Sequence, residues 1–303
     1  MLQNEVDDLP KVSVIIPCYN HDKYIKKAIL SVLNQSYSNI ELIVIDDGSK
    51  DNSVKIIEGI NTLYNNKFIF IKQSNIGLSS TLNKALHIAS GKYFTTCASD
   101  DLLHESKIEK QITFFKSNPS YKICFSKAGI INENGDYCVK ETKSLSTFNT
   151  NNDMFNDILT FKYHPPVSFM FQKDILFENG IYEDNCFAED FYMNLKLSKG
   201  YSFGYIAEEL YYYRMELSAG LGHASRMPMR FEASESHFAT LQGYTTEPMY
   251  PIAIQNWNFR RFMYFAAFKK FKLYALKGMV SSYKLIYKKE YLKSFFVLVF
   301  VWK

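Results

Sequence analysis

Hydrophobic and polar positions alternate in blocks along the first hundred residues. Four short runs are apolar and rich in β-branched or aromatic side chains, and a longer amphipathic segment lies between each pair of runs. Runs of the first kind predict strands buried on both faces, and apolar positions recurring every three or four residues predict helices. The predicted strands are 11–17, 40–46, 68–72 and 93–96, and the predicted helices are 25–33, 51–64 and 78–89.

This regular alternation predicts a parallel sheet with right-handed crossovers and helices on both faces. After a helix at 104–118 the pattern becomes less regular, with one or two strands expected at 122–131 and a hairpin-type turn at 132–136. The fold class is therefore α/β, a Rossmann-like mixed sheet with helices on both faces and a C-terminal helical extension. The later predicted strands are 122–131, 165–171, 202–206 and 209–214, and helices are predicted at 151–161, about 190–197, 259–275 and 281–302.

Polar clusters follow four of the predicted strands, at the point where each strand ends. They are 17–20, 46–49, 75–77 and 100–101. Ligands of open α/β sheets bind in the crevice outside the carboxyl ends of the strands. The four clusters, far apart in the sequence, are therefore expected to form one site.

Two adjacent carboxylates, Asp100 and Asp101, end the fourth strand. Ionised carboxylates that lie close together repel each other unless a cation lies between them. Hard oxygen ligands suit Mg²⁺ or Mn²⁺, which can take their remaining ligands from substrate phosphates. The simpler alternative is a turn followed by an aspartate that caps the helix at 104–118.

Glycine-rich phosphate loops are absent from the sequence. Neither G-x-G-x-x-G nor G-x-x-x-x-G-K-[ST] is present, and Pro-Cys-Tyr-Asn follows the first strand instead. A metal held by acids is therefore expected to neutralise any bound diphosphate.

Composition and charge single out the C-terminal segment of the chain. The chain has 303 residues and a net charge of only +4, but residues 260–303 hold eleven Lys or Arg and one Glu. Fifteen aromatic residues are interleaved with these charges from Trp257 onward, which is typical of peripheral attachment to an anionic membrane. The alternative is that these aromatics pack on the rest of the protein or form a dimer interface. No recognition motif accompanies the basic charge, so nucleic-acid binding is not expected.

The five cysteines are widely spaced, with no paired Cys-x-x-Cys motif, and the N-terminus lacks an apolar signal core. These features are typical of reduced thiols in the cytosol and argue against secretion. The protein is therefore expected to be cytoplasmic, and peripheral on the inner face of the plasma membrane if the basic, aromatic segment binds lipid.

Taken together, the motifs of residues 12–214 resemble those of the family 2 glycosyltransferases, which have the GT-A fold. One such motif would be weak support, but the ordered set is specific. The set comprises Val-Ser-Val-Ile-Ile-Pro-Cys-Tyr-Asn (12–20), Gln-Ser-Tyr-Ser-Asn-Ile-Glu-Leu-Ile-Val-Ile-Asp-Asp-Gly-Ser-Lys-Asp (35–51), Asn-Ile-Gly (75–77), Ser-Gly-Lys-Tyr (90–93), Ser-Asp-Asp (99–101) and Ala-Glu-Asp-Phe-Tyr (188–192).

The resemblance implies a specific role for each of several residues at the strand ends. Tyr19 would stack on the nucleobase, and Asp47, or Asp46 beside it, would accept a hydrogen bond from the base. Asp101 would be the main metal ligand, with Asp100 contacting the ribose or the metal. Many members have an acid where this chain has Ala98, so the assignment between Asp100 and Asp101 stays open. The further residues expected at the nucleotide are Pro17, Asn20, Asp51, Asn75 and Gly77.

The same resemblance assigns the catalytic base to Asp190, with Glu189 as the alternative. A base must lie within hydrogen-bond reach of the acceptor hydroxyl. Without the resemblance, Asp190 would be read as capping a helix. His223 could be a further metal ligand, although a surface histidine is the simpler interpretation. Arg214 could pair with phosphate or with a nearby acid.

The resemblance implies a metal-dependent, inverting glycosyltransferase that uses Mn²⁺ or Mg²⁺. It would move a sugar from a nucleotide-sugar donor, expected to be a UDP-sugar, to a glycan or a lipid-linked saccharide in cell-surface polysaccharide or lipopolysaccharide biosynthesis. Residues 1–220 would form the catalytic domain, with a nucleotide-sugar half at about 10–120 and an acceptor half at about 121–220. Residues 221–303 would form the helical, basic and aromatic extension. The alternatives are a sugar-nucleotide-binding protein without turnover and a nucleotidyltransferase.

Overall fold

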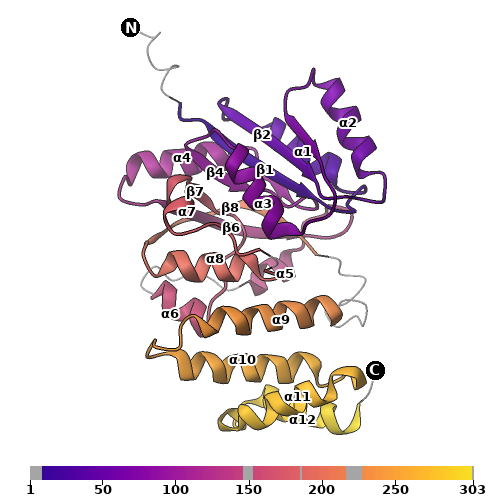
Figure 1. Ribbon diagram of the computed structural model, residues 1–303, viewed down its shortest axis with the longest axis vertical. Helices are drawn as coiled ribbons and strands as arrows, with labels where there is room; N and C mark the ends of the chain where they lie inside the picture. Colours follow the sequence, from indigo (N-terminus) through magenta and orange to yellow (C-terminus); the bar gives the residue numbers. More distant parts are fainter. Residues whose placement is uncertain (1–8, 146–152, 185, 216–226, 302–303) are drawn as a thin grey trace. The chain divides into compact units, whose positions relative to one another are not determined.

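The computed structural model describes residues 9–145, 153–184, 186–215 and 227–301 (Figure 1). The chain divides into two compact units. The first comprises residues 1–150, 165–186 and 196–215, and the second comprises 151–164, 187–195 and 216–303. The predicted division into a catalytic domain at 1–220 and an extension at 221–303 stays a prediction.

An eight-stranded mixed sheet forms the centre of the first unit, in the order β3-β2-β1-β4-β7-β6-β8-β5. β1 to β4 are parallel, β7 is antiparallel to β4 and β6, β6 is parallel to β8, and β5 is antiparallel to β8. The predicted mixed sheet is confirmed. The strands are β1 (Val12–Cys18), β2 (Ile40–Asp46), β3 (Ile69–Lys72), β4 (Tyr93–Thr96), β5 (Leu102–Leu103), β6 (Ile123–Ile131), β7 (Met170–Gln172) and β8 (Phe203–Arg214).

Helices cover both faces of this sheet. One buried cluster joins Val14 and Val44 of the sheet to Ile29 of α1, Ile57 of α2 and Ile112 of α4. Because β4 returns to the far side of β1, a right-handed crossover places α3 on the opposite face, where it contacts β1 and β2. The helices of this unit are α1 (Ile25–Leu33), α2 (Ser53–Leu63), α3 (Leu78–Ile88), α4 (Lys107–Ser117), α5 (Val139–Ser144) and α7 (Asp174–Glu178).

The direction of chain winding reverses between β1 and β4. From β1 the chain winds outward to β2 and β3, and then it returns to β4 on the other side of β1. At such a reversal the loops after the two strands diverge to opposite faces and leave a crevice at the carboxyl ends. The loop after β1 and the loop after β4 therefore flank the expected binding crevice.

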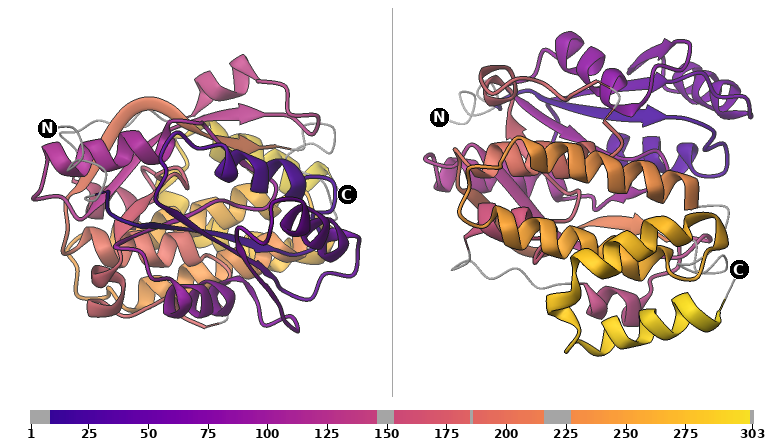
Figure 2. Two further views of the ribbon diagram at one scale, coloured as in Figure 1. Left: turned by 90° about the horizontal axis from the view of Figure 1, so that it is seen from above. Right: turned by 60° about the horizontal axis from the view of Figure 1, so that its bottom comes forward.

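Helices build the second unit, and Figure 2 shows α9 and α10 alongside each other. Trp257 of α10 packs with Ile158 and Leu241 in one buried cluster, and a second cluster gathers aromatic residues of α10 with α11 and α12. The elements are α6 (Met154–Leu159), α8 (Glu189–Ser198), whose last three residues belong to the first unit, α9 (Met227–Gln242), α10 (Tyr250–Phe265), η2 (Lys269–Phe271), α11 (Lys272–Ser281), η3 (Tyr283–Leu285) and α12 (Lys289–Phe300).

Some predicted boundaries were wrong. The helix expected at 259–275 is broken, because Phe268 adopts an extended backbone and buries its ring beside Phe265. The strands expected at 202–206 and 209–214 form the single strand β8, whose pairing with β6 is irregular around Lys127. None of the helices in the described part of the chain combines the length and the apolar character needed to cross a bilayer.

Candidate functional site

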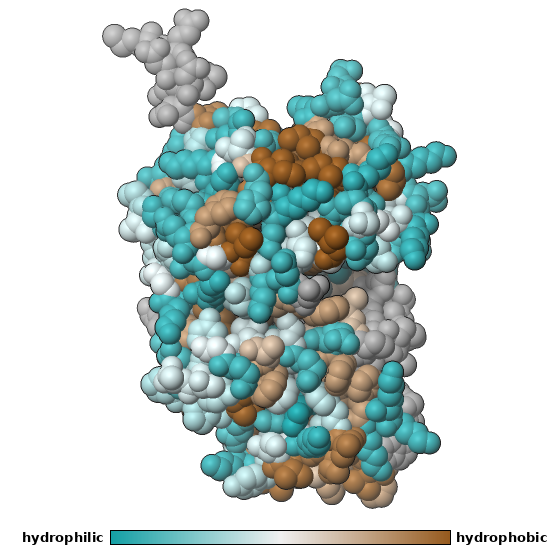
Figure 3. Space-filling model, in the orientation of Figure 1, coloured by the Kyte–Doolittle hydropathy of each residue, from teal (hydrophilic) through white to brown (hydrophobic). Residues whose placement is uncertain are grey.

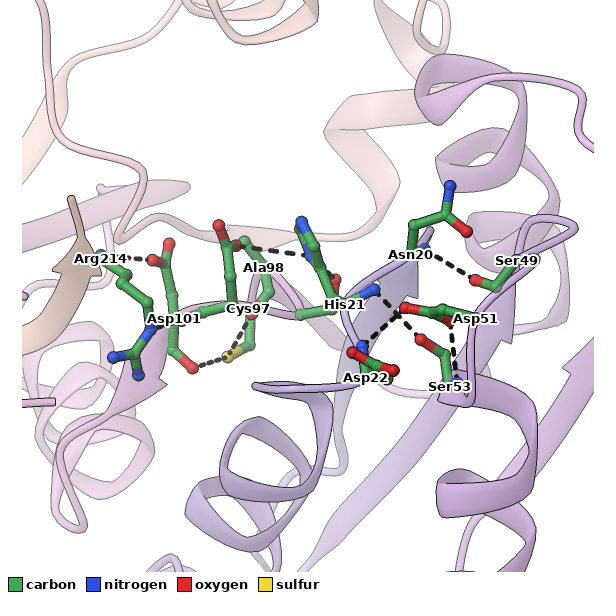
Figure 4. Close-up of polar contacts among 12 residues, drawn as sticks. Asn20, His21, Asp22, Ser49, Asp51, Ser53, Cys97, Ala98, Asp101 and Arg214 are labelled. Atoms are coloured by element: carbon green, nitrogen blue, oxygen red, sulfur yellow. Dashed lines mark hydrogen bonds and ion pairs between the residues drawn. The ribbon is translucent and has the colours of Figure 1, made fainter. Parts of the chain in front are cut away.

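The loop after β1 is hydrogen-bonded to the loop after β2 (Figure 4). The backbone N–H of Asn20 donates to Ser49 Oγ at 2.8 Å, and the N–H of Lys50 donates to the Asn20 side chain at 2.8 Å. The N–H of Asp22 donates to the Asp51 carboxylate at 2.9 Å. Asn20 has φ of 56°, a left-handed conformation that asparagine tolerates, so the chain can turn sharply out of β1. These bonds bring the first two predicted polar clusters together.

His21 connects this pair of loops to the loop after β4. Its Nδ1 atom lies 2.7 Å from Ser99 Oγ and 4.0 Å from the Asp100 carboxylate, and its backbone N–H donates to Ser53 Oγ. Sequence reasoning did not single out His21. Its position directly after the Pro-Cys-Tyr-Asn motif, on the loop that leaves β1, was the available signal.

The loop at 75–77 is held against the end of β2 by Asp47. The Asp47 carboxylate accepts hydrogen bonds from the backbone N–H groups of Ile76 and Gly77 and from the Gln73 side chain, each at 2.9 Å. Gly48 has φ of +79°, and a Cβ atom there would lie 2.8 Å from the backbone nitrogen of Asn75. Only glycine allows this close approach, so the predicted third cluster joins the site.

Asp46 and Asp47 differ in what remains for a ligand. Both carboxyl oxygens of Asp47 already accept hydrogen bonds from the chain. Asp46 accepts one bond from the N–H of Ser49, and its other oxygen is buried without a partner in the described part of the chain. The Asp51 carboxylate accepts a hydrogen bond from the N–H of Ser53, the first residue of α2. Burial alone would raise the pKa of Asp51, but hydrogen bonds from Ser53 and from the backbone of Asp22 hold it below its ordinary value.

Aromatic and small residues complete this edge of the sheet. The side chain of Tyr19 is 45% exposed, so its ring is available to a ligand at the end of β1. Pro17 is half-buried in β1, Asn75 is exposed, and Gly77 precedes α3 with φ of 85°. The predicted nucleotide-binding residues on the loops after β1, β2 and β3 therefore lie at one edge of the sheet.

The adjacent carboxylates Asp100 and Asp101 have different surroundings. Asp101 is 1% exposed; its two oxygens accept hydrogen bonds from Tyr211 Oη at 2.8 Å and from the backbone N–H of Arg214 at 2.7 Å. Burial and the charge of Asp100 raise the pKa of Asp101 to about 7. The Asp100 side chain is one-third exposed (33%) and faces His21. Asp100 is thus the carboxylate that is free to meet a ligand.

Arg214 secures the same loop from β8. Its guanidinium donates to the carbonyl oxygens of Asp100 and Asn132, and it lies 4.7 Å from the ring of Tyr24. These contacts are to backbone oxygens, and the Nη2 atom of Arg214 is buried without a hydrogen-bond partner in the described part of the chain; pairing with an acid or with phosphate stays a prediction. The Arg214 side chain therefore fixes the backbone at Asp100 and Asn132.

The second unit contains a pocket of about 300 Å³ that includes Asp190. The Nε2 atom of His164 lies 3.1 Å from Oδ2 of Asp190, and Oδ1 of Asp190 accepts a hydrogen bond from the N–H of Phe191 at 2.7 Å. Asp190 lies in the first turn of α8, where a carboxylate is favourable to the helix dipole. The pocket is lined by Ile158, Phe161, Tyr163, His164, Phe187, Ala188, Asp190, Phe191, Ala233, His237 and Arg260.

Neighbouring charges set the protonation of the acids at the start of α8. Burial alone would raise the pKa of Asp190, but the hydrogen bond and the charge of His164 hold it below its ordinary value. Burial, followed by the charge of Asp190, raises the pKa of Glu189 to about 8. These opposite shifts favour the ionised form of Asp190 and the protonated form of Glu189, which makes Asp190 the better proton acceptor.

His223 lies outside the described residues. Within the described ranges, no group of three or more His, Cys, Asp or Glu side chains is placed to hold a metal ion. His237 and Arg260, which line the pocket of the second unit, were not found from the sequence. They lie on α9 and α10, where the family motifs have ended.

The comparison with protein families decides the identity. Residues 13–184, more than half of the chain, match the model of glycosyl transferase family 2. The chain belongs to this family. The match spans the loops after β1, β2, β3 and β4.

Curated relatives of this family 2 protein are similar over part of their length. An uncharacterized glycosyltransferase of Haemophilus influenzae is 43% identical over 111 residues, which are 37% of this chain and 44% of that protein. Glycosyltransferase GlyA of Streptococcus pneumoniae is 37% identical over 117 residues, 39% of this chain and 16% of that protein. The chain thus spans less than half the length of these relatives.

Solved structures share the fold of this family 2 protein. TarS of S. aureus has a TM-score of 0.58 at 18% identity, with 94% of this chain and 49% of that chain covered. TarS 1-349, solved with UDP-GlcNAc, has a TM-score of 0.54 with 94% and 90% covered. The mannosyltransferase PcManGT of Pyrobaculum calidifontis, solved with GDP-Man and Mn2+, has a TM-score of 0.59 at 13% identity, with 96% and 84% covered. These likenesses show the GT-A fold predicted from the sequence.

Proposed function

We propose that this protein is an inverting glycosyltransferase. It transfers a sugar from a nucleotide-sugar donor, a UDP-sugar by preference, to a hydroxyl of a glycan or lipid-linked saccharide in cell-surface polysaccharide assembly. The observation that carries the proposal is that His21, on the loop after β1, contacts Ser53 at the start of α2 and both Ser99 and the one-third exposed Asp100 after β4, so that the family loops lie side by side. The donors bound by the structural neighbours, UDP-GlcNAc and GDP-Man, support a nucleotide-sugar.

The proposed donor site uses the residues at the strand ends. Tyr19 offers its exposed ring to the base, and the loop at 75–77 is hydrogen-bonded to Asp47 in the loop after β2. Asp46 and Asp47 differ as candidates for the base N–H, because Asp47 is already engaged by three donors and Asp46 keeps an oxygen without a partner among the described residues. Both carboxylates are almost fully buried, so we keep both Asp47 and Asp46 as candidates for this contact.

A divalent cation fits this site if the substrate supplies most of its ligands. The Asp100 carboxylate is one-third exposed, whereas both oxygens of the buried Asp101 accept hydrogen bonds from the chain. We therefore propose that Asp100 holds Mn²⁺ or Mg²⁺ and that Asp101 supports Asp100, which reverses the order of the two ligands expected from the sequence. Mg²⁺ commonly binds one or two carboxylates together with phosphates and water. When bound, the ion would neutralise the departing diphosphate.

The proposed chemical step uses Asp190. The ionised carboxylate accepts the proton of the acceptor hydroxyl while that oxygen bonds to the anomeric carbon of the donor sugar. The bond from the anomeric carbon to the diphosphate oxygen breaks, and its electron pair leaves with the nucleoside diphosphate. A single displacement of this kind inverts the anomeric centre.

The test compares two carboxamide variants, Asp190→Asn and Glu189→Gln, in release of UDP or GDP from a panel of nucleotide-sugars with and without glycan acceptors. Asp190→Asn is expected to lower kcat by about 10² to 10⁴-fold, the usual share of a general base, with donor affinity retained. Glu189→Gln resembles the protonated side chain that is already present at pH 7, so its kcat should change little.

Normal turnover of Asp190→Asn would remove Asp190 as the base. Transfer of a nucleotidyl group rather than a sugar would favour the nucleotidyltransferase. Binding of a nucleotide-sugar with no release of nucleotide under any condition would favour a binding protein.

We also propose that the second unit binds the inner face of the plasma membrane through α11, α12 and their connection. Part of the aromatic segment packs internally, but Val280, Ile286 and Tyr287 are at least 58% exposed. Figure 3 shows hydrophobic side chains at the surface around these helices. Lysines alternate with them, so the surface suits anionic lipid. The other exposed apolar residues there are Leu273, Leu276, Tyr283, Leu292, Phe295, Phe296, Val299, Phe300 and Val301.

Flotation with liposomes tests this attachment. The full chain is expected to bind vesicles that contain phosphatidylserine or phosphatidylglycerol, and less well neutral vesicles or vesicles at high salt. The double variant Ile286→Glu, Tyr287→Glu should lose binding. Leu63→Glu, at a residue of α2 that is 76% exposed, is the matched control and should bind normally. Self-association without lipid binding would instead identify a dimer interface.

A further inference from the structure

The pocket of the second unit has an unequal charge balance. Asp190 is paired with His164 at 3.1 Å, and the hydrogen bond and charge of Asp190 raise the pKa of His164 although burial would lower it. Burial, followed by the charge of Arg260, lowers the pKa of His237 to about 4, so His237 is neutral. Asp190 is thus already paired with His164, and the guanidinium of Arg260 is a second cationic group at the pocket wall.

Arg260 makes no ion pair with any carboxylate in the described part of the chain. Its guanidinium carbon lies 5.1 Å from the centre of the Phe161 ring and 5.4 Å from that of Tyr264. Such cation–π contacts fix the plane of the group while leaving its N–H donors unused. Arg260 is therefore a pre-oriented donor at the wall of the pocket.

The remaining wall suits a sugar. Phe161, Tyr163 and Phe187 line the pocket, and the Phe187 side chain is 59% exposed. Flat aromatic faces pack against the apolar C–H face of a sugar ring, and a few convergent polar groups then fix its orientation. The pocket thus places a cation, a carboxylate base and aromatic surface in one unit.

We propose that the acceptor of this enzyme is an anionic saccharide, whose carboxylate or phosphate is bound by Arg260 while its hydroxyl approaches Asp190. The guanidinium matches either anion with two parallel N–H···O bonds. Arg260 also reduces the repulsion between the anion and Asp190. This inference rests on the proposed function, because it assigns the substrate class of the proposed acceptor site.

Ligand-observed saturation-transfer NMR tests the inference on the full-length protein. The probes are methyl glucoside, methyl glucuronide and glucose 6-phosphate at equal concentration, which separate a neutral sugar, a carboxylate and a phosphate. The variants are Arg260→Gln, which removes the charge, Arg260→Lys, which keeps the charge without the planar fork, and Arg230→Gln. Arg230 lies 6.0 Å from the same Tyr264 ring but does not line the pocket, so it is the matched control.

The expected result is saturation transfer to one or both anionic sugars at least about threefold greater than to methyl glucoside, since a charge-assisted bidentate contact is stronger than a neutral one. Arg260→Gln should abolish this preference, Arg260→Lys should retain part of it, and Arg230→Gln should keep all of it. A response to the glucuronide alone identifies a carboxylate, and a response to the phosphate alone identifies a phosphate. Equal signals from all three sugars, no signal from any, or an unchanged preference in Arg260→Gln would overturn the inference.

Binding of UDP is measured in parallel on the same samples. Intact UDP binding without a preference for anionic sugars overturns this inference and leaves the donor half of the proposed function standing. Absence of UDP binding in the unmodified protein contradicts the proposed function itself.

Discussion

Nε2 of His164 lies 3.1 Å from Oδ2 of Asp190, and this contact keeps Asp190 ionised at the wall of an aromatic-lined pocket. Burial alone would raise the pKa of Asp190, and the hydrogen bond and charge of His164 reverse that effect. The proposed base is therefore tuned by a histidine 26 residues earlier in the chain.

Replacing His164 should move the pH profile of the enzyme. In His164→Asn the Asp190 carboxylate loses the positive charge beside it, so its pKa rises. The acid limb of the pH profile of kcat should shift to higher pH. If the pKa of Asp190 rises above the assay pH, kcat should fall by about tenfold for each unit by which it exceeds that pH. A fall in kcat with the limb unmoved would mean that His164 acts only on structure.

The two adjacent aspartates should separate in their effects. Asp100→Asn is expected to remove the Mn²⁺ dependence of UDP affinity without lowering the free energy of unfolding, because the Asp100 side chain is one-third exposed and its charge repels the buried Asp101. Tyr211→Phe should lower the free energy of unfolding by about 1–3 kcal/mol. The reason is that its hydroxyl donates to the buried Asp101 and accepts from the N–H of Ala98.

Calorimetry with and without EDTA, and urea unfolding, measure these two quantities. If UDP binding by Asp100→Asn still depends on the metal, Asp101 rather than Asp100 is the principal metal ligand.

Gly48 should be essential for the loop pair at 46–49 and 75–77. Gly48→Ala places a Cβ 2.8 Å from the backbone nitrogen of Asn75, at φ of +79°, and the loops must separate. We expect UDP affinity to fall by tenfold or more. Gly59→Ala is the matched control, since Gly59 lies within α2 with open space around it, and this change should stabilise the protein by about 0.5–1 kcal/mol. Unchanged UDP affinity in Gly48→Ala would separate the 75–77 loop from the nucleotide.

His237 should make the protein less stable in mild acid. Its ring packs edge-on against Phe161 and Phe191, and its pKa is lowered to about 4 by burial and then by Arg260. Between pH 6.5 and 4 the unfolded chain binds a proton that the folded chain does not, so this contribution to stability is lost as the pH falls through that range. In His237→Gln the free energy of unfolding should fall less steeply between pH 7 and 4.5, as measured by urea unfolding. Parallel curves for both proteins would contradict the assignment.

Local sequence patterns predicted the first half of the fold well. The apolar runs at Ile40–Asp46 and Tyr93–Thr96 are strands with the predicted bounds, because a strand buried on both faces leaves a continuous apolar signal. The convergence of the strand-end loops followed from topology. The different surroundings of Asp100 and Asp101 could not be predicted from local sequence, because they depend on Tyr211 and Arg214, more than a hundred residues away.

The second unit was harder to predict for a physical reason. Apolar residues lie on all sides of α10 and α11, so apolar periodicity does not mark where one helix ends. The break at Phe268 depends on tertiary packing. The pocket residues His237 and Arg260 have no local motif. Their meeting with Asp190 follows from the packing of α8, α9 and α10 within this unit.

The central claim is that the loops after β1, β2, β3 and β4 bind a nucleoside diphosphate. Calorimetric titration of UDP and GDP into the full chain, each with Mn²⁺ and with EDTA, tests it most directly. We predict binding of UDP that is stronger than that of GDP and that is weakened by EDTA. No binding of either nucleotide with Mn²⁺ would contradict the claim and leave the family and the fold without a donor.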